Sequence, residues 1–142
     1  MPLSDRQAAF LAEQHSAAMI TTGADGRPKV ARVGVALVEG RLQSSGTQDR
    51  VRTTRLRRDP TCTLFVFTAG PSWLALETTV QILEGPDSAE LNLKLFRVMQ
   101  GRAQGPLSWF GGELDEAGFL AAMAAERRLI YEFQVSRAYG PA

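Results

Sequence analysis

Residue types on which many enzymes depend are scarce in this chain. Its 142 residues include one cysteine, Cys62, and one histidine, His15. A single cysteine excludes an intrachain disulfide, and a single histidine excludes a metal site built from several histidines. We expect Cys62 to be a buried core thiol, because it lies in the apolar, β-prone run 61–67, and we expect His15 to have a structural role.

The short motifs of self-sufficient catalysis are also missing. The sequence has no Gly-x-Ser-x-Gly elbow, no Gly-x-Gly-x-x-Gly fingerprint, no Walker loop and no cluster of metal ligands. We therefore assign no catalytic residue and no metal. If the protein is an enzyme, a bound cofactor is expected to carry the reaction.

Long apolar runs are absent as well. No segment is apolar over the length needed to cross a membrane, and no signal peptide is visible, so we expect a cytoplasmic protein. A hydrophobic share of 44% and a length of 142 residues fit one globular domain, 1–142. The net charge of only +1 argues against nucleic-acid binding, which the clustered arginines nevertheless leave as an alternative.

Positive charge is present, but almost all of it is arginine. The chain has fourteen arginines and two lysines, and five of the arginines lie between Arg50 and Arg58. Arginine is the better residue for two-pronged contacts with phosphate. Arg50 and Arg52 fall in the first turn of an expected helix, where the helix dipole disfavours cations, and an anion bound between them would explain this. The last three arginines of the run lie where the dipole favours cations and need no ligand.

The residues that precede this helix complete a candidate anion site. We expect Asp49 to cap the helix and Pro60 to end it. The run Ser45-Gly46-Thr47 supplies two hydroxyl groups and a glycine that lets a ligand approach the backbone. Hydroxyl groups, a glycine and a helix N-terminus together are typical of a site for phosphate.

Hydrophobic periodicity and turn residues predict a mainly β fold with peripheral helices. Ser4 and Gln7 form a capping box at the start of a helix at 4–14. Tight turns between successive strands favour antiparallel pairing and a small closed barrel. One expected apolar face of the second strand consists of Ala31, Val33, Val35 and Leu37. The expected strands are 17–22, 29–38, 41–46, 61–68, 73–84 and 129–136, and the other expected helices are 49–59, 87–99 and 115–126.

The remaining segment, 100–114, is rich in glycine and is expected to be a loop. It carries Trp109 and Phe110, followed by two glycines. Two adjacent aromatic residues in such a loop suit a lid over a planar ligand. They suit an anchor that holds the loop to the barrel equally well, and the sequence leaves both possibilities open.

The arginine block and its setting resemble a known superfamily. Arg50-Val51-Arg52, followed by Arg57-Arg58-Asp59-Pro60 and a strand, resembles the split β-barrel flavin and deazaflavin proteins, which are also called pyridoxamine 5′-phosphate oxidase-like. Phe10-Leu11, the hairpin at 25–28 and the closing segment 128–133 add to the likeness, which spans roughly residues 8–137. Within the superfamily, the chain is most similar to the B-type reductases that use coenzyme F420. The resemblance implies a six-stranded antiparallel split β-barrel of the FMN-binding type.

The resemblance also implies a function and a site. It implies an F420H2-dependent reductase that transfers a hydride to an unsaturated small molecule. Among the residues, Tyr131 and Glu77 are candidates for the proton donor, and a structural role is the alternative for both. It implies a homodimer with sites at the interface, into which the partner's copy of Trp73 reaches. The alternatives are an FMN-binding oxidoreductase and a non-catalytic cofactor-binding protein. The implied cofactor-binding residues are Ser45, Gly46, Thr47, Arg50, Val51, Arg52 and Trp73.

Overall fold

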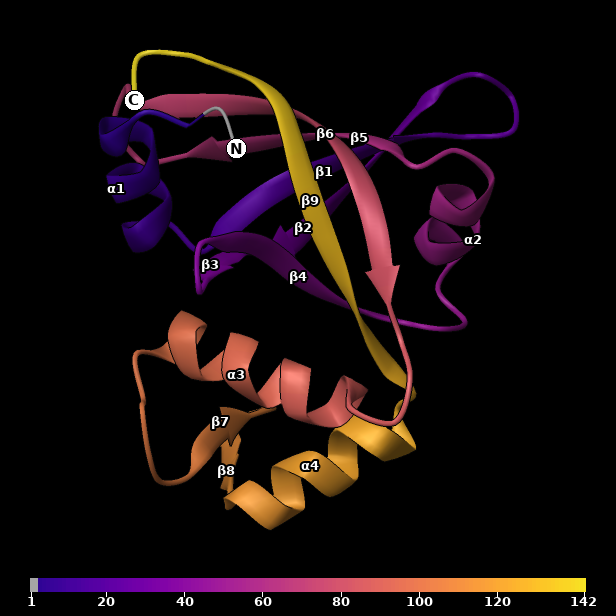
Figure 1. Ribbon diagram of the computed structural model, residues 1–142, viewed down its shortest axis with the longest axis vertical. Coiled ribbons are helices and arrows are strands. Elements are labelled where there is room, and N and C mark those ends of the chain that lie inside the picture. The colour runs from indigo at the N-terminus through magenta and orange to yellow at the C-terminus, as the bar shows by residue number, and fades with distance from the viewer. Residues whose placement is uncertain (1–2) are drawn as a thin grey trace.

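A curled antiparallel sheet forms the centre of the molecule in the computed structural model, which describes residues 3–142 (Figure 1). The strands lie in the order β2-β1-β5-β6-β9-β4-β3, and every neighbouring pair is antiparallel. The mainly β fold with antiparallel pairing is confirmed, but the sheet has seven strands, so the predicted six is wrong. They are β1 (Ser16–Thr22), β2 (Pro28–Gly34), β3 (Ala36–Val38), β4 (Arg41–Thr47), β5 (Thr61–Phe67), β6 (Trp73–Leu83) and β9 (Arg128–Tyr139).

The seventh strand arises because the chain changes its pairing partner at Val35. β2 pairs with β1 up to Gly34, whereas β3 pairs with β4. The Val35 N–H donates to the carbonyl of His15, 3.0 Å away, at the last contact with the β1 side. The apolar face predicted for 29–38 is correct, since its residues pack in one core despite the break. The curl of the sheet, which transfers this segment from one partner to another, is not visible in local periodicity.

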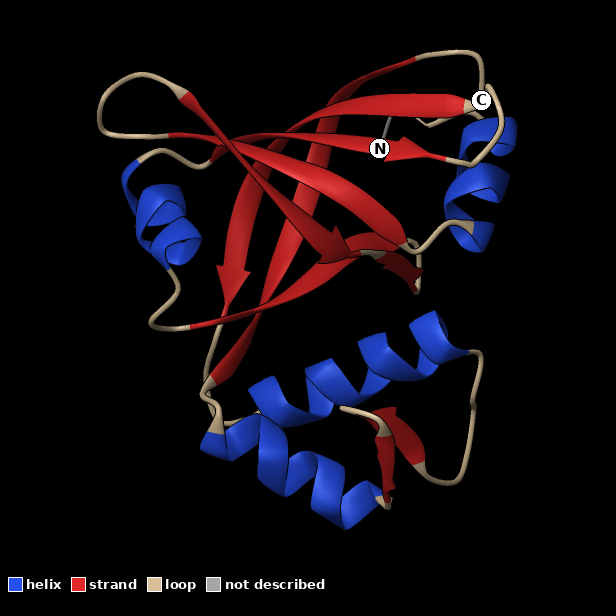
Figure 2. Cartoon of the chain, turned by 180° about the vertical axis from the view of Figure 1, so that it is seen from behind, coloured by secondary structure: helices blue, strands red, loops and turns tan. Residues whose placement is uncertain are grey.

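Four helices and a small hairpin surround the sheet. Both ribbon views place α3, α4 and the hairpin together at one end of the molecule, and α1 and α2 on opposite sides of the sheet (Figures 1 and 2). The hairpin lies in the segment expected to be a loop. None of the described helices has the length and apolar character needed to cross a bilayer. The elements are α1 (Asp5–Glu13), α2 (Val51–Arg58), α3 (Ser88–Gln100), α4 (Glu116–Ala125), β7 (Leu107–Trp109) and β8 (Gly112–Leu114).

Three hydrophobic clusters hold these elements together. The largest fills the inside of the curled sheet, where Leu64, Leu76 and Phe133 are buried. A second lies between β3, β9 and α3 around Ile130, and a third, centred on Phe119, joins α3, α4 and the hairpin. Because α3 belongs to both of the smaller clusters, it ties the outer helical layer to the sheet.

The predictions for Cys62, for His15 and for the start of α1 agree with the structure. Cys62 is buried in the main core, and burial raises the pKa of its thiol to about 12, so it is not a nucleophile at neutral pH. The Nδ1 atom of His15 lies 3.0 Å from the carbonyl oxygen of Val35. Ser4 and Gln7 form the predicted capping box. These features depend on neighbours in sequence or on composition, which explains why they could be predicted.

Candidate functional site

A pocket of about 520 Å³ opens at the N-terminal end of α2, between the end of β4 and the edge strand β2. Several of the predicted residues meet here. The pocket combines three guanidinium groups with one carboxylate, so its character is cationic. It is lined by Ala31, Thr47, Asp49, Arg50, Val51, Arg52 and Arg55.

The five arginines of the block divide into two groups. Arg50, Arg52 and Arg55 line the pocket, although Arg55 was expected to face solvent without a ligand. Arg57 donates to Glu84 over 2.6 Å, and Arg58 donates to the carbonyl of Thr22 over 2.9 Å. Arg57 and Arg58 therefore have protein partners away from the pocket.

The N-terminus of α2 differs from the sequence prediction in one respect. Arg50, and not Asp49, is the N-cap residue, and no side chain in the described part of the chain caps the helix. Asp49 instead accepts a hydrogen bond from the Thr47 hydroxyl, over 2.7 Å, and this bond holds the pKa of its carboxyl below the usual value. The Thr53 N–H donates to the carbonyl of Arg50 over 3.1 Å, so among the first-turn amides those of Val51 and Arg52 have no partner within the described residues.

Arg52 is the least satisfied polar residue of the site. Its Nε is buried, and within residues 3–142 it has no hydrogen-bond partner. Burial also lowers the pKa of its guanidinium, because the charged form loses hydration. A buried donor without an acceptor is costly and rare in folded proteins. An anion in the pocket would supply the missing acceptor.

The residue after Arg52, Thr53, belongs to a buried pair of hydroxyl groups. Thr53 and Tyr131 are both fully buried, and their hydroxyl groups are hydrogen-bonded to each other. Thr53 Oγ1 also donates to the carbonyl of Thr47 over 2.7 Å. Tyr131 reaches this place from β9, which pairs with β4. Sequence reasoning missed Thr53 as part of the site, because only the fold reveals its contact with Tyr131.

Gly46 and Ser45 have structural partners that the sequence did not reveal. A Cβ at Gly46 would overlap the ring and hydroxyl of Tyr131, so the glycine makes room for that side chain. Ser45 is buried, and its hydroxyl lies 2.5 Å from Asn92 of α3 and 3.3 Å from Arg128. Of the run 45–47, only Thr47 lines the pocket.

Trp73 lies far from the arginines within one chain. It pairs with Phe67 at the end of β5, whereas α2 leads into the start of that strand at Thr61. A seven-residue strand spans about 20 Å. Trp73 packs instead against Phe65, at 5.5 Å between ring centroids, and against Tyr139, at 6.3 Å. A single chain therefore does not bring Trp73 to the pocket.

Two further arginines, Arg127 and Arg128, stand beside the arginine pocket at the start of β9. The register between β4 and β9 pairs Thr47 with Arg128. Arg127 donates to Gln48 over 2.5 Å, and Arg128 forms an ion pair with Glu126 at 2.7 Å. No local pattern links these arginines to the predicted block, since about 70 residues separate the two in the chain.

The two adjacent aromatic side chains of the 100–114 segment, Trp109 and Phe110, lie in different surroundings. Trp109 packs edge-to-face against Phe96 and Phe119 at 5.3 and 5.4 Å, and Arg128 lies over its ring at 5.3 Å. Phe110 is 86% exposed at the tip of the hairpin, with a positive φ of 46°. Trp109 is thus an anchor, whereas Phe110 contacts only the Trp109 ring among the aromatic residues, at 4.9 Å, and both line a pocket of about 520 Å³.

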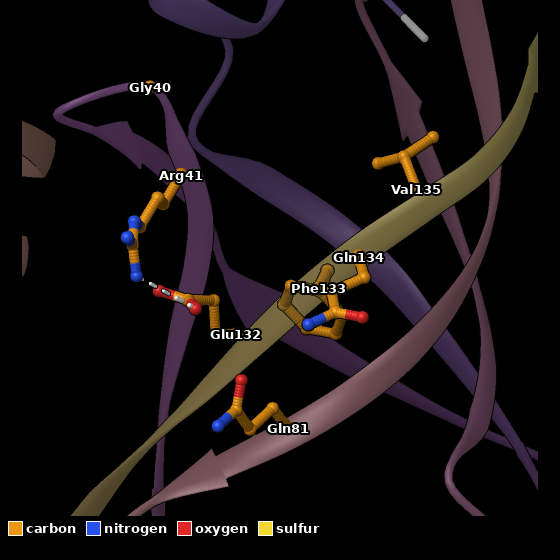
Figure 3. A pocket seen from close by; sticks show the side chains of 7 residues that line it. All are labelled: Gly40, Arg41, Gln81, Glu132, Phe133, Gln134 and Val135. Atoms are coloured by element: carbon orange, nitrogen blue, oxygen red, sulfur yellow. Dashed lines mark hydrogen bonds and ion pairs between the residues drawn. The ribbon is translucent and has the colours of Figure 1, made fainter. Parts of the chain in front are cut away.

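A second hollow, of about 500 Å³, lies over β9 and the β3–β4 turn (Figure 3). Its buried carboxylate, Glu132, accepts from Gln43 over 2.9 Å and pairs with Arg41 at 3.4 Å. Gln81 and Gln134 are further lining residues. An acidic side chain with satisfied partners does not suit a phosphate, so the arginine pocket is the better candidate.

Several solved structures share the fold of this chain at low sequence identity. An F420 reductase superposes with a TM-score of 0.71 at 19% identity, covering 96% of this chain and 98% of the other. A candidate pyridoxamine 5′-phosphate oxidase from Listeria innocua gives 0.67 at 13% identity, with 96% of each chain covered. HutZ, the heme storage protein of Vibrio cholerae, gives 0.66 at 14% identity, covering 99% and 95%.

These likenesses establish a shared fold. No protein-family model and no curated protein matches the sequence. Because the sequence identities are only 13–19%, the ligand of a neighbour is not evidence for the ligand of this chain. The mainly β, curled antiparallel fold is consistent with the split barrel that the resemblance implied, and the activity has to be argued from the pocket.

Proposed function

We propose that this protein is a flavin- or deazaflavin-type oxidoreductase that binds the phosphate group of coenzyme F420 at the N-terminus of α2. One observation carries the proposal. Arg52 holds a buried Nε without a partner at a helix end that no described side chain caps. A phosphate oxygen would accept from this nitrogen, and the helix dipole would favour the same anion.

The residues of the pocket have different roles in the proposed binding of the cofactor. Arg52 and Arg50 bind the phosphate, while Val51, which is 65% exposed, offers an apolar surface beside it. The bond from the Thr47 hydroxyl holds the Asp49 carboxylate and, with the charges of Arg127 and Arg50, keeps its pKa below the usual value. When bound, the reduced deazaflavin supplies a hydride, and the chain has to position the coenzyme against an unsaturated small-molecule substrate.

Neither of the two residues considered as proton donors lines the pocket. Tyr131 is fully buried with its hydroxyl bonded to Thr53, and Glu77 lies on β6 opposite Arg137 of β9. We therefore propose that solvent supplies the proton that must accompany the hydride.

The proposal includes a homodimer. Phe67, 55% exposed, and Tyr139, 41% exposed, join Phe65 and Trp73 in an aromatic cluster at the end of the sheet away from the arginine pocket. Exposed aromatic clusters are typical of protein interfaces. A second copy that covers this cluster would bring Trp73 toward the partner's arginine pocket, which is open on one side.

Spectroscopy of the protein with each cofactor tests the proposal. We expect reduced and oxidised F420 to bind with a change in coenzyme fluorescence, and reduced coenzyme to be oxidised when quinones or enones are added. A yellow chromophore that survives gel filtration would favour FMN. Tight binding without turnover over a broad substrate panel would indicate a cofactor-binding protein. If neither F420 nor FMN binds, the proposal is wrong.

A further inference from the structure

The junction between α4 and β9 lies against the turn that leads into α2. Thr47 and Arg128 are the last residue pair in the register between β4 and β9. One step further, the Gln48 N–H donates to the carbonyl of Arg127 over 3.1 Å. The Arg50 N–H donates to the carbonyl of Thr47 over 3.3 Å, and this bond closes a β-turn. The turn therefore leads directly from β4 to the N-cap residue of α2.

The side chain of Arg127 binds the same turn. Its Nη2 atom donates to Oε1 of Gln48 over 2.5 Å, so one residue binds both the main chain and the side chain of Gln48. The other three residues of the turn, Thr47, Asp49 and Arg50, line the arginine pocket. Gln48 and Arg127 are not among the lining residues, so their bond can act on a ligand only through the turn.

The backbone of Arg127 has a conformation that favours glycine. Its φ is 54°, and it directly follows Glu126, the C-cap residue of α4. Glycine is common at this position because it has no Cβ, whereas other residues are strained there. Among the described residues, Gln48 is the one hydrogen-bond acceptor of the Arg127 side chain. The contact with Gln48 thus explains why an arginine stands where glycine would fit the backbone better.

The next residue, Arg128, has partners outside the turn. Its Nη1 donates to Oγ of Ser45 over 3.3 Å, and its Nε and Nη2 donate to Glu126 over 3.0 and 2.7 Å. Its guanidinium also lies over the ring of Trp109. Arg128 therefore joins β4 to the outer helical layer, and of the two consecutive arginines it is Arg127 whose side chain holds the turn.

We propose that Arg127 is a positioning residue for the bound phosphate: by holding Gln48, it keeps the turn in the form that presents Arg50 and the free amides at the start of α2 to the anion. A turn that is ordered before the ligand arrives loses less conformational entropy on binding. This inference rests on the proposed function and adds to it a residue that lies outside the pocket. Arg127 itself does not touch the ligand.

Arg127→Gly removes the side chain and relieves the positive φ. Since glycine suits this backbone, Tm should hold or rise. The Kd for inorganic phosphate, and separately for F420, should rise about fivefold, which corresponds to the loss of one exposed hydrogen bond. Arg127→Lys, which keeps a charged donor, should recover most of the affinity. Arg6→Ala is the matched control, because it removes one positive charge from α1 on the opposite side of the sheet, and it should leave both constants unchanged.

Gln48→Met separates positioning from simple attraction by the Arg127 charge. The variant keeps that charge and removes the acceptor, so the Kd for phosphate should again rise about fivefold. In an Arg127→Gly background, Gln48→Met should have no further effect, because the bond is already lost. If Gln48→Met binds phosphate like the wild type while Arg127→Gly binds weakly, charge alone acts and the inference is wrong. Equal losses from Gln48→Met in both backgrounds would also overturn it.

Nuclear magnetic resonance relaxation of the backbone amides gives a readout that does not depend on affinity. In Gln48→Met without ligand, the order parameters of Asp49 and Arg50 should fall, whereas those of the core strands should stay the same. Saturating phosphate should restore them. Order parameters at Asp49 and Arg50 that equal those of the wild type would contradict the inference.

Arg52→Ala keeps the inference and the proposed function apart. If Arg52→Ala loses phosphate binding while Arg127→Gly and Gln48→Met bind like the wild type, the proposed function stands and only the inference fails. If the wild-type protein binds neither F420 nor phosphate, both fail.

Discussion

At the scale of single residues, the candidate site depends on one buried nitrogen, the Nε of Arg52, that lacks a hydrogen-bond partner among the described residues. Arg57 and Arg58 have protein acceptors, whereas the buried Nε of Arg52 has none among the described residues. The sequence could separate these arginines by their position along the helix, since the helix dipole acts differently at its two ends. It could not show which nitrogen is buried, because burial depends on β4 and β9.

Cys62 gives a prediction about pH at the same scale. Burial raises the pKa of its thiol from 9.0 to about 12, so the unfolded chain loses this proton at a lower pH than the folded one. The stability from this group is fully present below pH 9 and is lost as pH rises toward 12, by roughly 1.4 kcal/mol per pH unit. Thermal unfolding of the wild type and Cys62→Ala at pH 8–11 checks this. The difference in Tm between them should change across the range, and a constant difference would contradict the prediction.

At the scale of elements, features set by local sequence pattern could be predicted, whereas features set by long-range strand pairing could not. The helix at α1 and the apolar face of 29–38 follow from capping and from a period of two, and both are confirmed. The break at Val35 and the hairpin at 107–114 were not predicted. Both depend on pairing partners, and three-residue strands such as β3, β7 and β8 are too short to show a period.

The hairpin provides a test of its two aromatic residues. Trp109 packs against Phe96 and Phe119, so Trp109→Ala should destabilise the protein by about 2–4 kcal/mol. Phe110 is almost fully exposed, and Phe110→Ala should change the free energy of unfolding by less than about 0.5 kcal/mol. Urea denaturation of both variants measures the difference. Equal losses would mean that the hairpin packs differently.

At the scale of the whole molecule, one chain supplies only part of the expected site. The arginine pocket is at one end of the sheet, and Trp73 with its aromatic neighbours is at the other. A twofold arrangement would join each pocket to the partner's Trp73, as the resemblance to split-barrel proteins implied. The oligomeric state is therefore part of the functional proposal.

Phe67→Asp tests the dimer. Because Phe67 is exposed in the aromatic cluster, a charge there should prevent its burial against a second copy. Sedimentation should give twice the 15.5 kDa chain mass for the wild type and the single mass for the variant at micromolar concentration. Phe110→Asp, at the exposed hairpin tip, is the control and should remain dimeric. A monomeric wild type would refute the dimer.

The central claim is that Arg52 binds the phosphate of the cofactor. A fluorescence titration with F420 of the wild type, Arg52→Ala and Arg57→Ala tests it most directly. Arg52→Ala should weaken binding by roughly 1–3 kcal/mol, the range of a charge-assisted contact, and Arg50→Ala should act in the same direction. Arg57→Ala should bind like the wild type, because Arg57 is paired with Glu84. If Arg57→Ala weakens binding as much as Arg52→Ala, the phosphate lies elsewhere and the account is wrong.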